Sequence, residues 1–125
     1  MKVRIFYHHT DCGGVVYYAN YLNFLEEART EYFEQRGIII LELAKKGVLF
    51  VVVHQEIDYK APAFYADTLE VISRVSDIGA SKIEFAYEIK NQNGKTVSLA
   101  KTVLVCVDKN LKPVAMPEEI RVRLK

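Results

Sequence analysis

One long helical segment, followed by strand patterns over most of the remaining chain, is the feature that most constrains the fold. Apolar residues recur at helical spacing and form a broad stripe: Tyr21, Leu22, Phe24, Leu25, Ala28, Tyr32 and Phe33. Asn20 is a suitable N-cap, and Gly37 tolerates the positive φ that ends many helices. A helix from Asn20 to Arg36 that is apolar nearly all round should be buried on more than one side, so a sheet must curl around it.

Five segments carry strand patterns, and only one of them precedes the helix. They are Val3–Tyr7, Val48–Tyr59, Leu69–Val75, Lys82–Lys90 and Thr96–Val107. In the fourth, apolar residues at every second position alternate mostly with charged ones, as in a half-buried strand. Asn93-Gly94 favours a tight hairpin between the last two strands, and Asp77-Ile78-Gly79 should turn the chain before them.

We also expect a short helix at Leu41–Lys46 and one helical turn near the C-terminus. The order β-α-β-β-β-β indicates one α+β domain over residues 1–125. In this domain a curved antiparallel β-sheet should wrap around one long central helix.

Composition excludes several classes of protein. Half of the residues are hydrophobic, so the chain should fold, and 17 basic against 16 acidic residues leave no surplus charge for binding nucleic acid. The longest apolar stretch, Val48–Val53, is far too short to span a membrane as a helix. The chain opens without a signal-type segment, and two cysteines do not make a disulfide framework. We therefore expect a cytoplasmic protein that is not membrane-spanning.

The loop before the helix, YHHTDCGGVVYYANY at residues 7–21, holds most of the reactive side chains. Its one acid, Asp11, is suited either to capping a turn or to acting as a base. Gly13-Gly14 either forms a tight turn or brings bare backbone N–H groups to a ligand. Beside the positive end of a helix, such groups would stabilise a developing oxyanion.

Other chemistries find less support in this loop. His8 and His9 on a strand would point to opposite faces, so they cannot easily bind one metal ion together. Cys12 lacks a fixed basic partner to activate it as a nucleophile. Motifs of serine hydrolases, zinc proteases and phosphate-binding loops are absent. We expect no metal and no cofactor. Hydrolysis of a thioester is a reaction that so few catalytic groups could support. The thiolate leaves without a general acid, so one carboxylate and one oxyanion donor are enough.

These residues also resemble a known family. Thr10–Tyr17 reads T-D-x-x-G-x-V-Y and Asn20–Arg29 reads N-Y-x-x-x-x-E-x-A-R. Both are similar to the 4-hydroxybenzoyl-CoA thioesterase family and, within it, to the Tol-Pal-associated acyl-CoA thioesterase branch (the YbgC type). The likeness covers almost the whole chain through four later segments: Gly47-Val48, Asp58–Ala63, Asp67–Glu70 and Val105–Asp108. The resemblance implies the hotdog fold and hydrolysis of an acyl-CoA thioester to a free acid and coenzyme A. It also implies a homodimer or homotetramer with acyl-CoA at the subunit interface.

The resemblance assigns roles to residues of the loop. Asp11 matches the catalytic carboxylate, and Tyr7 matches a tyrosine on the first strand. Gly13 and Gly14 should lie near the thioester, with a backbone N–H at the start of the helix polarising its carbonyl. Tyr18 departs from the pattern, because the related branch usually has histidine there. Tyrosine donates a hydrogen bond but is a poor base at neutral pH.

Further residues should hold the phosphates of coenzyme A. The resemblance places Gly79, Ser81 and Lys82 in this role, and Lys60 is another candidate cation. An acyl-carrier protein is the alternative to coenzyme A as carrier of the acyl group. Two other functions stay open: a binding protein for acyl-CoA or acyl carrier without turnover, and a hydratase or dehydratase of acyl thioesters. The latter would need a histidine partner for Asp11.

Overall fold

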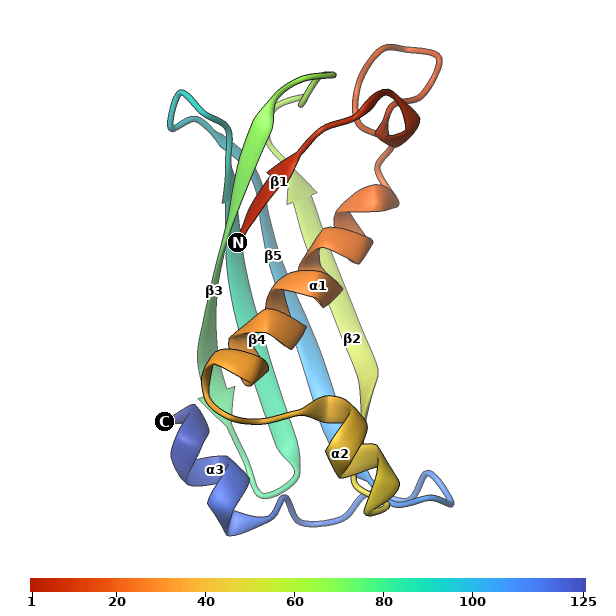
Figure 1. Cartoon of the computed structure of the whole chain (residues 1–125), viewed down its shortest axis with the longest axis vertical. Helices are drawn as coiled ribbons and strands as arrows, with labels where there is room; N and C mark the ends of the chain where they lie inside the picture. The colour runs from red at the N-terminus through yellow and green to blue at the C-terminus, as the bar shows by residue number, and fades with distance from the viewer.

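The computed structural model describes residues 1–125, and its elements keep the predicted order, including the predicted short helix after the long one, with one 3₁₀ helix added before the long helix (Figure 1). The elements are β1 (Lys2–Arg4), the 3₁₀ helix η1 (Tyr7–His9), α1 (Asn20–Gln35), α2 (Ile40–Lys45), β2 (Leu49–Tyr59), β3 (Thr68–Ile78), β4 (Lys82–Lys90), β5 (Thr96–Val107) and α3 (Glu118–Leu124).

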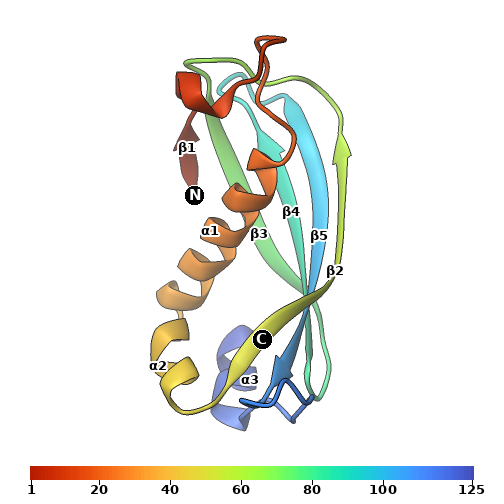
Figure 2. The ribbon, with the colours of Figure 1, turned by 90° about the vertical axis from the view of Figure 1, so that its right-hand side faces the viewer.

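The five strands form one antiparallel sheet in the order β1-β3-β4-β5-β2. Figure 2 shows that this sheet curves and that α1 lies along its concave side. The alternation predicted for β4 is confirmed, because Ile83, Phe85, Tyr87 and Ile89 are all buried. The ring of Phe85 meets the rings of Tyr32 and Phe33 on α1 edge-on. The predicted α+β architecture, a curved antiparallel sheet with one long central helix, is therefore confirmed.

Helix α1 is buried on one side only, which corrects the expectation of burial on more than one side. Its buried residues are Tyr21, Phe24, Leu25, Ala28 and Phe33. In contrast, Leu22 is 42% exposed, and Glu26 and Glu27 are exposed as well. The reason is geometric: the open sheet covers one flank of the helix and leaves the other uncovered in a single subunit (Figure 2).

The predicted N-cap of α1 is wrong, whereas the predicted C-terminal end is correct. The N-cap is Ala19 rather than Asn20, which is the first helical residue. The side-chain amide of Asn20 instead donates a hydrogen bond of 2.8 Å to the backbone carbonyl of His9. The C-terminal end is as predicted: Gly37 has φ of 73°, and the N–H of Ile38 reaches back to the carbonyl of Phe33 at 2.9 Å. This is the Schellman ending that glycine favours.

Two strand predictions and one helix prediction need correction. The first strand stops at Arg4, so Tyr7 lies in η1 and not on a strand. Strand β3 continues to Ile78 through a register shift between Val75 and Asp77, and the turn follows it. Helix α3 has seven residues instead of one turn, because two of its apolar side chains, Ile120 and Leu124, are buried in the core.

The edge strands of the sheet are unequal. Strand β1 has three residues, whereas β2 has eleven and pairs only with β5. The other edge of β2 has no partner strand in the subunit, and its residues Val52 and Val53 are 48% and 57% exposed. No helix is long and apolar enough to cross a membrane.

Candidate active site

The Asp11 loop, residues 10–17, is a tight hairpin whose turn the aspartate itself helps to close. The N–H of Asp11 donates to the carbonyl of Val15 at 2.9 Å, and the N–H of Gly14 donates to the carbonyl of Asp11 at 3.0 Å. The Oδ1 atom of Asp11 accepts a hydrogen bond of 2.8 Å from the N–H of Gly13. Gly14 has φ of 81°, a conformation that side chains disfavour. Asp11 thus caps the turn, and its exposed carboxylate keeps Oδ2 free for chemistry.

Neighbouring segments fix the position of this hairpin. Thr10 bridges to Val16, and the N–H of Tyr17 donates to the carbonyl of His9 at 2.9 Å. On its other side, the N–H of Val16 donates to the carbonyl of Ala63 at 2.9 Å. Ala63 belongs to the connection after β2, so the Asp11 loop is held between the end of that strand and the start of α1.

A cavity of about 360 Å³ opens beside the loop. Nine residues line it: Asp11, Val15, Val16, Tyr18, Tyr21, Tyr59, Lys60, Ala61 and Pro62. The structure therefore brings together Asp11, Tyr18 and Lys60 from the predicted set. Tyr21 and Tyr59 were not predicted as site residues, although Tyr59 stands in the Asp58–Ala63 segment that resembles the family.

The tyrosines of this cavity form a connected group. The hydroxyl of Tyr59 donates to the backbone carbonyl of Tyr18 at 3.2 Å. The ring of Tyr59 lies edge-on to those of Tyr18 and Tyr21, with centroids 6.3 Å and 5.5 Å away. Burial raises the pKa of Tyr21 to about 12 and also raises the pKa of Tyr59. Both hydroxyls therefore stay protonated at neutral pH and serve as donors, not as bases.

The backbone N–H groups of the site decide between the two uses that the sequence left open for the glycine pair. The N–H groups of Gly13 and Gly14 are already bonded to Asp11, so they are not the bare donors that the glycine pair suggested. The N–H groups of Val15, Tyr18 and Ala19 have no acceptor within the chain. Tyr18 and Ala19 precede α1 directly, where the helix dipole favours negative charge. The expected oxyanion donor is therefore available at the helix start and not in the glycine pair.

The structure does not bring the other predicted residues to this cavity. Tyr7 is 81% exposed, and its ring lies 6.1 Å from that of Tyr65. Gly79, Ser81 and Lys82 belong to the β3–β4 turn, at the opposite end of the subunit from the Asp11 loop (Figure 1).

Within that distant segment, some of the groups that could donate to a phosphate already have partners. Lys82 Nζ lies 3.4 Å from Asp77 Oδ2. The N–H of Gly79 donates to the carbonyl of Lys82 at 2.7 Å, whereas the hydroxyl of Ser81 has no hydrogen bond within the chain. In one subunit these residues cannot share a ligand with Asp11.

The histidines next to Asp11 and the two cysteines were also considered as metal ligands or nucleophiles, and the structure shows where they lie. His8 and His9 lie in η1 and not on a strand, with ring centroids 4.1 Å apart, so the argument from opposite faces was wrong. No three potential metal-ligating side chains of His, Cys, Asp or Glu type gather anywhere in the subunit. Cys12 is exposed in the Asp11 loop and Cys106 is buried.

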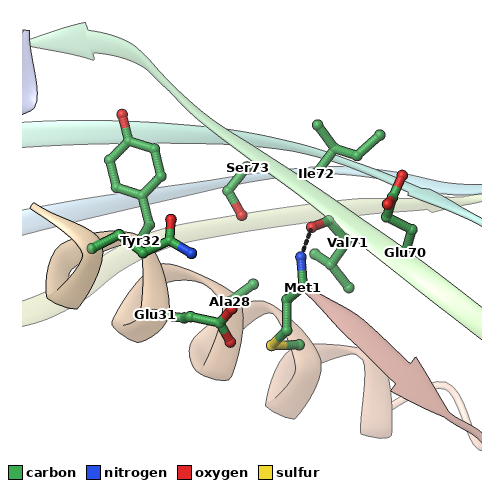
Figure 3. Close-up of a pocket in the computed structure, with 9 residues that line it drawn as sticks. Met1, Ala28, Glu31, Tyr32, Glu70, Val71, Ile72 and Ser73 are labelled. Atoms are coloured by element: carbon green, nitrogen blue, oxygen red, sulfur yellow. Dashed lines mark hydrogen bonds between the residues drawn. The ribbon is translucent and has the colours of Figure 1, made fainter.

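A larger hollow, of about 450 Å³, lies between α1 and β3 (Figure 3). Its polar lining includes the carboxylates of Glu31 and Glu70, and the N-terminal ammonium of Met1 donates to the carbonyl of Val71 at 3.0 Å. It contains neither Asp11 nor any residue that precedes α1 other than Met1. Size alone therefore does not identify the reactive site, and we assign the smaller cavity on its chemistry.

Comparison with known proteins identifies the family of this chain. The thioesterase-like superfamily matches residues 7–124. The acyl-CoA thioester hydrolase YbgC of Escherichia coli is 36% identical over 124 residues, which is 98% of this chain and 92% of that protein. The acyl-CoA thioesterase YbgC of Haemophilus influenzae is 40% identical over 121 residues, 95% of this chain and 88% of that protein.

Solved structures show the same fold. A hypothetical protein from Aquifex aeolicus superposes with a TM-score of 0.94 at 29% identity, over 100% of this chain and 98% of that one. A DHNA-CoA thioesterase from Staphylococcus aureus superposes with a TM-score of 0.89 at 28% identity, over 92% of this chain and 78% of that one.

Proposed function

Since this chain belongs to the thioesterase-like superfamily and has its hotdog fold, we propose that it is an acyl-CoA thioesterase with Asp11 as the catalytic carboxylate. One observation carries this proposal. Asp11, whose Oδ2 has no hydrogen bond within the chain, lines a cavity together with Val15 and Tyr18, whose backbone N–H groups have no acceptor. A base or nucleophile and an oxyanion donor are the two parts that thioester hydrolysis needs.

The reaction follows from these groups. The N–H at the start of α1 donates a hydrogen bond to the thioester oxygen and stabilises the negative charge that develops on it. Asp11 takes a proton from water, whose oxygen adds to the carbonyl carbon. Collapse of the tetrahedral intermediate breaks the carbon–sulfur bond, and the thiolate of coenzyme A takes the proton back from Asp11. With Asp11 as nucleophile, its carboxylate adds to the carbonyl carbon and displaces the thiolate of coenzyme A, which leaves a mixed anhydride. Water then hydrolyses the anhydride to the free acid and regenerates Asp11.

Other residues of the cavity support this reaction. Tyr18 and Tyr59 contribute hydroxyl groups to the lining, and the exposed side chain of Lys60 contributes a cation for an anionic substrate. The lining contains no histidine. This absence counts against a hydratase or dehydratase, which would need a partner for Asp11 near the α and β carbons.

Assembly into a homodimer or homotetramer belongs to the same proposal. Strand β2 leaves eleven residues of edge unpaired, and two neighbouring valines on it are exposed. Natural sheets protect such edges, and pairing with a second copy does so. Antiparallel pairing of two β2 strands reverses one subunit, so the 79–82 turn of one copy comes toward the Asp11 end of the other. The predicted phosphate-binding residues would then act across the interface.

A thiol-release assay over a series of acyl-CoA chain lengths, with aromatic acyl groups and acyl-carrier thioesters included, tests the function. We expect catalytic release of free thiol with at least one of them. A flat trace with every substrate, together with measurable acyl-CoA binding, would show a binding protein instead.

A further inference from the structure

Tyr59 makes a hydrogen bond to which the family resemblance assigns no role. It is the last residue of β2, paired with Ser98 of β5, and the next N–H, from Lys60, donates to the carbonyl of Val97 at 2.8 Å. The backbone that carries the Tyr59 ring is thus fixed on both sides. Its hydroxyl reaches a backbone carbonyl 41 residues away, that of Tyr18.

That carbonyl belongs to the peptide unit between Tyr18 and Ala19. A trans peptide is planar, with its C=O and N–H directed to opposite sides. A hydrogen bond that holds the carbonyl of Tyr18 therefore also sets the direction of the N–H of Ala19. This N–H has no acceptor within the chain.

The conformation of Ala19 says where its N–H is directed. Ala19 is the N-cap and has helical angles, φ of −71° and ψ of −21°. N–H groups at a helix start point outward along the axis, away from the helix body. The only other bond that the Tyr18 carbonyl accepts is a long one, 3.4 Å from the N–H of Tyr21. Without the Tyr59 hydroxyl, this peptide would be held by that weak contact alone.

We propose that Tyr59 is a positioning residue, which clamps the Tyr18–Ala19 peptide through its carbonyl so that the Ala19 N–H stays aimed as the oxyanion donor. This proposal rests on the proposed thioesterase function. The bond also polarises the peptide, which strengthens the N–H as a donor. Because the pKa of Tyr59 is raised above its ordinary value, its hydroxyl remains a donor throughout the neutral pH range.

The test compares Tyr59→Phe with the unchanged full-length protein in the thiol-release assay. Phenylalanine keeps the ring contacts to Tyr18 and Tyr21 and removes only the hydroxyl. We expect kcat to fall roughly five- to tenfold, as for one neutral hydrogen bond, with KM changed less than about twofold. The shape of the pH–rate profile should not change, because Tyr59 transfers no proton. Binding of a thioether analogue of the substrate, which lacks the carbonyl, should be unaffected.

Tyr65→Phe is the matched control, because Tyr65 is 55% exposed and lies outside the cavity lining. It should leave kcat unchanged. A Tyr59→Phe enzyme with more than half of the normal kcat would overturn the clamp. So would a loss of rate that comes with a raised KM, a changed pH profile or a Tm lowered by much more than the few degrees that one lost hydrogen bond costs, since these indicate binding, proton-transfer or structural roles. If the unchanged protein shows no turnover, the proposed function fails, and the Tyr59 comparison plays no part in that result.

Discussion

The two oxygens of Asp11 have different surroundings: Oδ1 accepts the N–H of Gly13 at 2.8 Å, and Oδ2 has no hydrogen bond within the chain. One oxygen closes the turn, and the other is free to meet water or substrate. An amide oxygen accepts a hydrogen bond as a carboxylate does, so substitution can separate the two roles.

Asp11→Asn should therefore preserve the loop and abolish the chemistry. We expect kcat to fall at least about 10²-fold, the low end for loss of a general base, with Tm and acyl-CoA affinity nearly unchanged. Steady-state kinetics and thermal unfolding measure both. Cys12→Ser is the control, because Cys12 is adjacent and exposed but has no role in the proposal. Near-normal turnover of Asp11→Asn would contradict the mechanism.

Tyr18→Phe should have a modest effect. The Tyr59 bond goes to the backbone carbonyl of Tyr18, so this variant keeps the clamp and loses one neutral hydroxyl, worth about 1 kcal/mol. Tyr18→His, which restores the usual residue of the related branch, should be tolerated. Steady-state kinetics of the unchanged protein and of both variants measure these effects. A collapse in Tyr18→Phe as deep as that in Asp11→Asn would require a second essential group.

Gly14→Ala and Gly94→Ala form a matched pair. Both glycines have positive φ, 81° and 78°, and an added Cβ would meet nothing within 4 Å at either. The backbone penalty should be similar, about 1 kcal/mol, and should lower Tm by a few degrees in each. Only Gly14→Ala should also lower kcat, since Gly94 lies in the β4–β5 hairpin, outside the Asp11 loop and the cavity lining. Equal kcat losses in both variants would show that activity follows stability alone.

His9 should make the stability depend on pH. Burial lowers its pKa from the ordinary 6.5, the neighbouring His8 lowers it further, and Glu27 opposes the shift. The Nδ1 atom of His9 also accepts the N–H of Phe6 at 2.9 Å, which requires an unprotonated nitrogen. Below pH 6.5 the unfolded chain therefore binds more protons than the native one, so stability falls as the pH drops through 6.5 toward the native pKa.

Thermal unfolding from pH 5 to 8 measures this effect. His9→Asn keeps an acceptor near the Nδ1 position but cannot titrate, so its Tm should vary less over that range. His54→Asn is the control, because His54 is exposed and meets only Glu56, at 3.7 Å. An unchanged slope in His9→Asn would assign the pH dependence to other groups.

Light scattering at micromolar concentration should show a dimer or tetramer and not a 14.3 kDa monomer. Val53→Lys places a charge on the exposed edge strand and should shift the protein toward monomer and lower its activity. Ile72→Lys adds the same charge at a residue of β3 that is 43% exposed and should leave assembly intact. A fully active monomer would contradict both the interface and the location of the site.

Local sequence patterns predicted most helices and strands, because these elements depend on interactions between residues close together in the chain. The alternation in β4 and the glycine ending of α1 depend on residues within a few positions of one another. The use of Gly13 and Gly14 was not decided by sequence, since a closed turn and an open donor pair require the same residues. The meeting of Tyr59 with Tyr18 depends on how β2 and the loop before α1 come together. The role of the 79–82 turn depends further on a second copy of the chain.

The hairpin that carries Asp11 is joined to the chain just beyond β2 by the bond from Val16 to Ala63, and Tyr59 connects the same strand to the start of α1. The strand that would bind the second subunit thus also supports the Asp11 loop and the N–H that we propose as the oxyanion donor. Separation of the subunits would loosen both at once. Specific activity should then decline on dilution, so the concentration of the protein itself would act as a control on its rate.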